Sequence, residues 1–244
     1  MEHQLLTYNI QAGIGTGSYG QYLSQVHHQV IHTQTKSRTL GRIANLLMRY
    51  DIVCLQEIDL GGRRSGFRNQ VERIAEASGH NHFSLQENRV VGKISRHGNA
   101  VLSRYKHEDV QDLKLPGSKP GRGALLVKVC ADPKPVWVMN VHLSLGIADQ
   151  MEQVKFIADH APTNSRLIIC GDFNCSASSA PVKYLTETLG IDCHTKSKHK
   201  SYPSWNPRKD YDHILTSRSL HSEEVDVLPV RYSDHRPVSL IVES

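Results

Sequence analysis

The sequence lacks any long apolar run. No stretch of its 244 residues approaches the roughly 20 apolar residues that a membrane-spanning helix needs, so we expect no stable membrane insertion. Residues Met1 to Gln4 lack the basic segment and long apolar stretch that begin a secretory signal. No linker rich in proline, glycine and serine divides the chain, which predicts a single domain over residues 1–244.

Cysteine is scarce, and its spacing excludes the common metal and disulfide frameworks. The five cysteines are odd in number, form no Cys-x-x-Cys pair, and in three cases lie in or next to apolar runs. This pattern fits reduced thiols in the core of a cytoplasmic protein.

An excess of acidic residues is also missing. The formal charge of +5 and the isoelectric point of about 8.9 favour a polyanionic partner only weakly. Basic residues gather in three clusters, and the ordinary interpretation of each is a solvated surface. The clusters are Arg63, Arg64 and Arg68; Lys93, Arg96 and His97; and Lys196, Lys198, His199 and Lys200. No segment indicates a protein partner.

The hydrophobic pattern predicts a mixed α/β fold. Short apolar runs bounded by turn residues predict strands, and segments with a 3.6-residue period around Leu40, Val71 and Met151 predict helices between them. Because several runs are apolar on both faces, we expect stacked sheets with helices on either side. The predicted strands are 5–10, 52–56, 100–103, 124–129, 136–143, 167–170, 212–216 and 238–242.

The polar stretch from Gly13 to Ser37 interrupts this pattern. It is rich in glycine, glutamine and histidine and follows the first predicted strand. Two interpretations stay open, a mobile surface loop and a loop that covers the substrate.

The segment Cys170-Gly171-Asp172-Phe173-Asn174 closes an apolar run with a carboxylate and an amide two residues apart. Side chains alternate along a strand, so Asp172 and Asn174 point the same way as the chain leaves the strand. They can then share a water or a metal, although an Asx-rich turn gives the same pattern.

Six further polar clusters follow or precede predicted strands, and together they suggest a phosphate-handling site. Their residue types are Glu, Asp, Asn and His without cysteine, which suit a hard divalent cation and phosphate oxygens. The clusters are 8–10, 55–59, 97–100, 140–143, 211–214 and 233–237.

The residues of these motifs and their order along the chain resemble those of the endonuclease/exonuclease/phosphatase superfamily. This is the group of exonuclease III, deoxyribonuclease I, inositol-polyphosphate 5-phosphatases and neutral sphingomyelinases. Leu55-Gln56-Glu57, residues 171–174 and Ser233-Asp234-His235-Arg236-Pro237 carry the resemblance, which spans residues 5–242. It implies a four-layer sandwich of two packed mixed β-sheets flanked by helices, with the active site where strand ends meet.

The resemblance also implies a metal site. Glu57 matches the principal Mg²⁺ ligand of the family, Asn9 matches the amide beside it, and Asp234 lies on the metal or phosphate side. Mn²⁺ is the expected substitute. Mg²⁺ takes one or two carboxylates with waters and substrate oxygens, so a small protein ligand set is sufficient.

The catalytic roles follow from the same resemblance. Asp172 matches the residue that orients and deprotonates the attacking water, and Asn174 the neighbour that holds this water or a phosphate oxygen. His235 matches the imidazole on the scissile phosphate, with Asp212 as its orienting carboxylate. His142 matches a second histidine that serves phosphate binding or leaving-group protonation, a pattern unlike that of exonuclease III.

Supporting roles fall on three further residues. Asn99 matches an amide that supports the site through hydrogen bonds, with a turn-forming role as the alternative. Arg64 and Arg122 are candidates to clamp phosphate bidentately. Other histidines, including His97 and His213, lack metal-ligand spacing and are interpreted as incidental.

The predicted function is a Mg²⁺-dependent phosphoesterase that cleaves phosphodiesters by direct attack of water. The basic clusters, with Tyr202 and Trp205 in a loop, favour a nuclease acting on DNA or RNA, although a proline-ordered loop packed on the domain is the simpler interpretation of that segment. His142 and the compact length favour a lipid-headgroup or small-molecule substrate. A non-catalytic module that binds a phosphate ligand is the alternative of another class.

Overall fold

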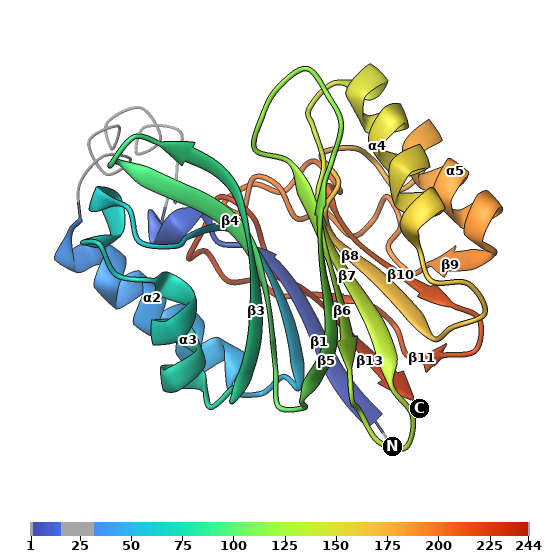
Figure 1. Ribbon diagram of the computed structural model, residues 1–244, viewed down its shortest axis with the longest axis horizontal. Helices are drawn as coiled ribbons and strands as arrows, with labels where there is room; N and C mark the ends of the chain where they lie inside the picture. Colours follow the sequence, from blue (N-terminus) through green and yellow to red (C-terminus); the bar gives the residue numbers. More distant parts are fainter. Residues whose placement is uncertain (1, 16–31, 244) are drawn as a thin grey trace.

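The computed structural model describes residues 2–15 and 32–243. In this part of the chain, two mixed β-sheets pack face to face, and a pair of helices covers the outer face of each sheet (Figure 1). The predicted four-layer α/β sandwich is therefore confirmed. The predicted loop from Gly13 to Ser37 falls mostly on residues 16–31, outside the described residues.

The first sheet carries both ends of the described chain. Its strands are β1 (Glu2–Asn9), β2 (Ile52–Asp59), β3 (His82–Val91), β4 (Ser95–Ser103), β11 (His221–Ser222), β12 (Asp226–Val227) and β13 (Val238–Glu243). Their order is β11-β13-β1-β2-β4-β3, with β12 also paired to β13. β1 and β2 are parallel, with Leu5 opposite Ile52, so both strands finish at the same end of the sheet.

The second sheet, like the first, contains a parallel pair of strands among antiparallel ones. Its strands are β5 (His107–Lys114), β6 (Gly123–Val129), β7 (Val136–His142), β8 (Leu167–Asp172), β9 (Ile191–Cys193) and β10 (Asp212–Ser217). Their order is β5-β6-β7-β8-β10-β9. β7 and β8 are parallel and in register, so that His142 lies opposite Asp172.

Helices cover the two outer faces. Those on the first sheet are α2 (Gln34–Leu47) and α3 (Gln70–Ser78), and those on the second are α4 (Ile147–His160) and α5 (Ala180–Leu189). Short 3₁₀ turns η1 (Gln11–Gly13) and η3 (Arg63–Ser65) follow β1 and β2. The three periodic segments of the sequence correspond to α2, α3 and α4. No helix within residues 2–15 and 32–243 is long and apolar enough to cross a membrane.

Apolar side chains fill the spaces between the layers. Leu5, Val127 and Ile168 are among those packed between the sheets, and further clusters lie under each helix pair. The central strands are consequently buried on both faces, which explains their nearly continuous apolar sequences.

The sequence patterns missed β3, β5 and α5. β3 and β5 are outer strands, and most side chains of β5 are exposed, so neither has the apolar run of a buried strand. α5 is short and begins beside Pro181, which its first turn tolerates because that turn needs no intrahelical N–H bond.

A buried amide pair ties the two sheets together near the end where β1, β2, β7 and β8 finish. Gln56 donates from Nε2 to Oδ1 of Asn140 at 2.7 Å. Asn140 donates from Nδ2 to the carbonyl oxygens of Leu55 and Ala100, at 2.9 and 2.8 Å. Both side chains are fully buried, so these bonds fix one sheet against the other beside the site described next.

Candidate active site

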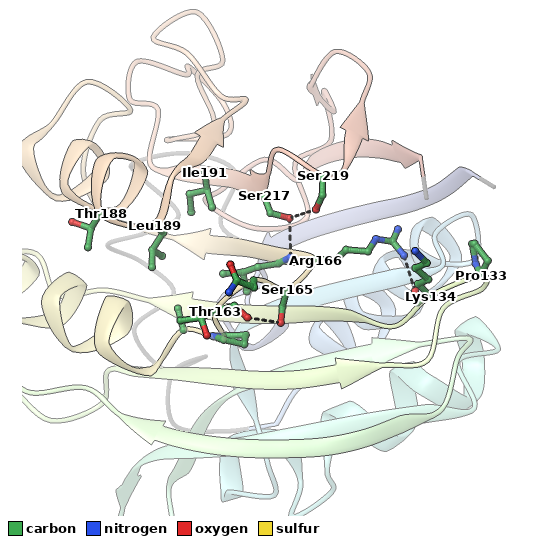
Figure 2. Close-up of a pocket in the computed structure, with 14 residues that line it drawn as sticks. Pro133, Lys134, Thr163, Ser165, Arg166, Thr188, Leu189, Ile191, Ser217 and Ser219 are labelled. Atoms are coloured by element: carbon green, nitrogen blue, oxygen red, sulfur yellow. Dashed lines mark hydrogen bonds between the residues drawn. The ribbon is translucent and has the colours of Figure 1, made fainter.

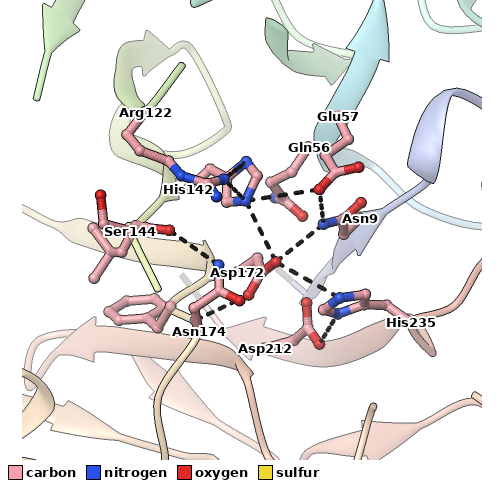
Figure 3. A network of polar contacts seen from close by, with 12 residues as sticks. Asn9, Gln56, Glu57, Arg122, His142, Ser144, Asp172, Asn174, Asp212 and His235 are labelled. Carbon is pink, nitrogen blue, oxygen red and sulfur yellow. Dashed lines mark hydrogen bonds and ion pairs between the residues drawn. The ribbon is translucent and has the colours of Figure 1, made fainter. Parts of the chain in front are cut away.

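Polar side chains from both sheets meet where the parallel strands end (Figure 3). Asn9 is the last residue of β1, His142 the last of β7 and Asp172 the last of β8, while Asp212 begins the antiparallel β10 opposite Asp172. Residues far apart in the sequence thus lie together because strand ends converge, which is the arrangement that the motifs predicted.

Glu57 reaches this site through an irregularity in β2. The pairing of β2 with β4 shifts register between Leu55 and Ile58, and Glu57 has a φ of 55°. Such a backbone is uncommon for a residue other than glycine and is often found where a bulge directs a side chain into a functional site. The Glu57 side chain is 34% exposed, so it is accessible to solvent and ligand.

The backbone around Asp172 depends on its neighbours. Gly171 has a φ of 147°, and a Cβ there would lie 1.9 Å from the carbonyl oxygen of Val141 on β7, so only glycine fits. Asn174 has a φ of 52°, and its N–H donates to Asp172 Oδ1 at 3.0 Å. The Asn174 side chain donates to the carbonyl of Leu143 at 3.0 Å, which anchors this turn to the end of β7.

Asp172 is the centre of the site. Its Oδ2 accepts a hydrogen bond from Asn9 Nδ2 at 3.0 Å and lies 3.6 Å from Nε2 of His142 and 3.7 Å from Nε2 of His235. Burial raises the pKa of Asp172 to about 7; the nearby His235 opposes this and Asp212 adds to it. The carboxyl group can therefore gain and lose a proton near neutral pH.

His235 is held by a buried carboxylate. Its Nδ1 donates to Asp212 Oδ2 at 2.8 Å, and that oxygen also accepts from Ser201 Oγ at 2.5 Å. Burial by itself lowers the pKa of His235, but the charges of Asp212 and Asp172 outweigh it and raise the pKa above its ordinary value. The imidazole is consequently positively charged at neutral pH, with Nε2 directed toward Asp172 (Figure 3).

His142 differs from His235 in its charge. Burial, and then the guanidinium of Arg122, lower the pKa of His142 well below its ordinary value. Arg122 Nη1 lies 3.1 Å from Nδ1 and also contacts Nε2. His142 is therefore a neutral imidazole, a weak acid for protonating a leaving group.

The carboxylates of Glu57 and Asp234 are close enough to interact electrostatically. Burial raises the pKa of Asp234 to about 6; the charge of His235 opposes this and the charge of Glu57 adds to it. Glu57 Oε1 accepts from Asn9 Nδ2 at 3.2 Å, and Asn9 Oδ1 accepts from the N–H of Gln11 at 3.1 Å. The amide of Asn9 therefore faces the carboxylates with its nitrogen, as a donor, whereas the resemblance placed Asn9 with Glu57 at the metal.

This donor set fits a hard divalent cation. Glu57 and Asp234 offer carboxylate oxygens, their mutual repulsion is relieved by a bound cation, and no thiolate lies among them. Asp172, Asp212 and His235 also have ligand atoms within 4.8 Å of one another. Asp212 already uses Oδ2 for His235 and Ser201, so a metal between these three would break the pair that orients His235.

Two predicted supporting residues serve the protein itself. Arg64 pairs through Nε with Asp59, and its Nη2 lies 3.1 Å from Nδ1 of His97, so the edge that would clamp phosphate is already used. Asn99 donates to Gln86 Oε1 and to the Gly123 carbonyl, both at 3.1 Å, which links β4 to β6, and it lines a pocket with Glu57.

Three residues near the site were missed or interpreted differently. Ser201 gives no sequence signal, because a serine in a polar loop is unremarkable. His97 lines a pocket with Glu57 and His142, whereas the sequence placed it among incidental histidines. The Tyr202 ring packs 4.8 Å from that of His235 and 5.6 Å from that of Tyr211, so it belongs to the wall of the site.

A larger pocket lies elsewhere in the described part of the chain. It has a volume of about 950 Å³ and is formed around the start of β8 and the ends of α4 and α5, with Arg166 and Lys134 near its edge (Figure 2). None of its fourteen lining residues is Asp, Glu or His.

Comparison of the sequence with known proteins found a family and a relative. The model of the Endonuclease/Exonuclease/phosphatase family matches residues 6–235. The uncharacterized protein YbhP of Escherichia coli K12 is 29% identical over 214 residues, covering 78% of this chain and 81% of its own length.

Solved structures share the fold. An endonuclease/exonuclease/phosphatase from Beutenbergia cavernae has a TM-score of 0.79 at 20% identity, covering 99% of this chain and 71% of that one. A mannosyl-6-phosphatase from Bacteroides thetaiotaomicron has a TM-score of 0.74 at 15% identity, covering 99% of this chain and 100% of that one.

Proposed function

Because the chain belongs to the endonuclease/exonuclease/phosphatase family, which includes phosphoesterases and nucleases, we propose that it is a Mg²⁺-dependent hydrolase of phosphodiesters in which water attacks phosphorus directly. The observation that carries the proposal is the surroundings of Asp172 Oδ2, with an amide nitrogen at 3.0 Å and two imidazole nitrogens at 3.6 and 3.7 Å.

Asp172 is the proposed general base. Its carboxyl group has a pKa of about 7 because it is buried, so near neutral pH its basic form is present and strong enough to take a proton from water. In the reaction the water oxygen forms a bond to phosphorus, the water proton passes to Asp172, and the ester oxygen leaves with the electrons of its bond. Asn174 and Asn9 hold the two carboxylate oxygens in place for this transfer.

His235 is the proposed cationic partner of the phosphate. Its positive charge, maintained by Asp212, stabilises the negative charge that develops on the nonbridging oxygens. His142 is neutral, so we assign it to phosphate binding rather than to leaving-group protonation, together with Arg122 beside it.

Glu57 and Asp234 would hold the cation. Mg²⁺, or Mn²⁺ as a substitute, polarises the phosphoryl oxygens and neutralises charge on the leaving oxygen when it is bound. Asn9 would keep Glu57 and Asp172 at a fixed separation through its two hydrogen bonds.

A small phosphate ester is a second candidate substrate. The pocket beside Glu57, His97 and Arg122 has a volume of about 150 Å³, which suits a phosphoryl group with a small substituent. The family relative that is a mannosyl-6-phosphatase acts on a sugar phosphate by its name. The packing of Tyr202 against His235 and Tyr211 leaves less support for base stacking by this ring in a nuclease.

Compartment and partners stay predictions. The five cysteines are free thiols, in keeping with a cytoplasmic location, which cell fractionation would test. The single-domain organisation of residues 1–244 and the non-catalytic alternative are likewise open to experiment.

The test is an assay of purified protein with Mg²⁺, Mn²⁺ or chelator. Its substrates are bis-p-nitrophenyl phosphate, p-nitrophenyl phosphate, plasmid DNA, an RNA oligonucleotide and a phospholipid. We expect metal-dependent cleavage of at least one diester and a kcat lower by about 100 to 1,000-fold in Asp172→Asn, because the base is lost.

The matched control is Asp192→Asn, an exposed carboxylate on β9 paired with Arg218, which we expect to retain activity. Cleavage confined to p-nitrophenyl phosphate would identify a monoesterase. Absence of hydrolysis throughout, with binding of phosphate retained, would favour the non-catalytic module.

A further inference from the structure

Two pockets adjoin each other beside the proposed active site. The first, of about 150 Å³, is lined by residues that include Glu57 and His142. The second, of about 520 Å³, lies toward the start of α4. Arg89, Pro120 and Arg122 line both pockets, so a ligand seated on the first can extend directly into the second.

Three cationic side chains line this pair of pockets without a carboxylate partner among the described residues. Arg89 and Lys119 are exposed, and Arg122 is half-buried with Nη1 against the neutral ring of His142. Elsewhere in the described chain many cations are paired with acids. Examples are Arg64 with Asp59, Arg96 with Glu87, Lys128 with Glu108, Lys198 with Glu224 and Lys200 with Asp210.

Among the described residues, Asp149 is the one carboxylate that lines the second pocket, and it is already engaged. Asp149 accepts hydrogen bonds from the N–H of Ser118 at 3.1 Å and from its Oγ at 2.8 Å. These bonds hold the segment between β5 and β6 against α4, and Gln153 adds a bond from Nε2 to the Pro116 carbonyl at 2.8 Å. The pocket therefore keeps an excess of positive charge.

The segment between β5 and β6 also packs closely against β3. Gly121 has a φ of 100°, and a Cβ there would lie 3.3 Å from the Cβ of Arg89. The absence of a side chain at Gly121 lets the Arg89 stem pass over the segment and brings Arg89 and Arg122 to one wall. The hydrogen bonds from this segment to α4 hold the backbone that carries Lys119 and Arg122 in place before a ligand arrives.

We propose that the second pocket binds a second anionic group of the substrate, a phosphate next to the one that is cleaved, through Arg89 and Lys119, with Arg122 between the two phosphates. This inference rests on the proposed function, because it places the reacting phosphate at Asp172 and His235. It narrows the substrate to esters that carry two phosphates, which are found both in small bisphosphates and along a nucleic-acid backbone.

The test compares two esters with the same leaving group, p-nitrophenyl 3-hydroxypropyl phosphate and p-nitrophenyl 3-phosphopropyl phosphate. We expect kcat/KM to be at least about tenfold higher for the ester with the second phosphate, since charged hydrogen bonds are gained. In the double variant Arg89→Gln/Lys119→Gln, the ratio of the two kcat/KM values should fall to within about threefold of one, and salt should reduce it in the wild type.

The control is Arg42→Gln/Lys183→Gln, which removes the same charge from exposed positions on α2 and α5. It should keep the wild-type ratio. Equal hydrolysis of the two esters by the wild type, or an unchanged ratio in the pocket variant, would overturn the inference and leave the proposed function standing. Hydrolysis of neither ester would refute both.

The source of the second phosphate is resolved by oligothymidylates with a 5′-p-nitrophenyl ester. If kcat/KM stops rising after one added phosphate, the substrate class is a small bisphosphate. A kcat/KM that continues to rise with the length of the oligothymidylate identifies a nucleic acid.

Discussion

The second sheet has a pocket at each end, and the two differ in size and in chemistry. Strand β8 runs from Leu167, which lines the pocket of about 950 Å³, to Asp172 in the proposed active site. Of the residues that the structure describes, no acid and no imidazole lines the larger pocket, whereas the pocket of about 150 Å³ next to Asp172 includes Glu57, His97 and His142. A choice by volume alone would therefore select the end that lies away from Asp172.

The difference follows from strand direction. Parallel strands β1 and β2, and β7 and β8, all finish at the same end of the sandwich, and the chain leaves them there in turns that can carry polar side chains. At the other end the same strands begin, and the pocket is left between loops and helix ends (Figure 2). Substitutions at the two ends test whether catalysis depends on residues at one end of the sandwich alone.

The largest effect is expected from His235→Ala. Loss of the imidazolium should lower kcat by about 100 to 1,000-fold, because charge developing on the phosphate is no longer stabilised. His235→Gln, which keeps a donor near Asp212, separates this effect from unfolding, and His160→Ala at the exposed end of α4 is the control. Steady-state kinetics that show kcat within about threefold of wild type would contradict the assignment.

Glu57→Gln should act through the metal. With one carboxylate charge removed, we expect the Mg²⁺ concentration for half-maximal activity to rise by about 10 to 100-fold. A metal titration of the variant measures this, and Glu187→Gln on α5 is the exposed control. An unchanged titration would show that the cation is held elsewhere, and Asp172, Asp212 and His235 would become the next candidate ligands.

Gly171→Ala should affect stability at the active-site end. The added Cβ would lie 1.9 Å from the Val141 carbonyl, so β7 and β8 must separate. We expect unfolding free energy to fall by about 1 to 3 kcal/mol or more, measured by urea denaturation. Gly41→Ala, in the exposed interior of α2 with no atom within 4 Å of a Cβ, is the contrasting control and should stabilise by about 0.5 to 1 kcal/mol.

The smallest effect is expected at the larger pocket. Arg166→Gln removes a side chain whose Nη1 donates to the Lys134 carbonyl at 2.8 Å, far along β8 from Asp172. We expect kcat/KM to stay within about twofold of wild type, because surface changes of this kind are usually small. A loss of tenfold or more would show that the two ends are coupled and would break the contrast between them.

Much of the site could be predicted because its residues stand in short motifs at strand ends. Glu57, Asp172 and His235 follow or precede apolar runs in a recognisable order, and the structure brings them together with His142 and Asp212. Arg64 shows the limit of such reasoning, since it has the charge to bind phosphate but is paired with Asp59.

Pairing of this kind depends on contacts between distant residues. Ser201 reaches Asp212, and Arg89 lines the same pockets as Arg122, although no local pattern marks either relation. Asn9 similarly turns its amide nitrogen to Asp172, 163 positions away, because Gln11 N–H occupies its oxygen.

The sequence by itself determined the fold class and the types of residue at the site. Apolar periodicity and turn residues act locally, so they dictate which strands are buried and where polar residues follow them. Only the tertiary structure decided which charges are neutralised and which are left for a ligand. Charge interactions depend on separation in space and on burial, and both are set when the two sheets pack together.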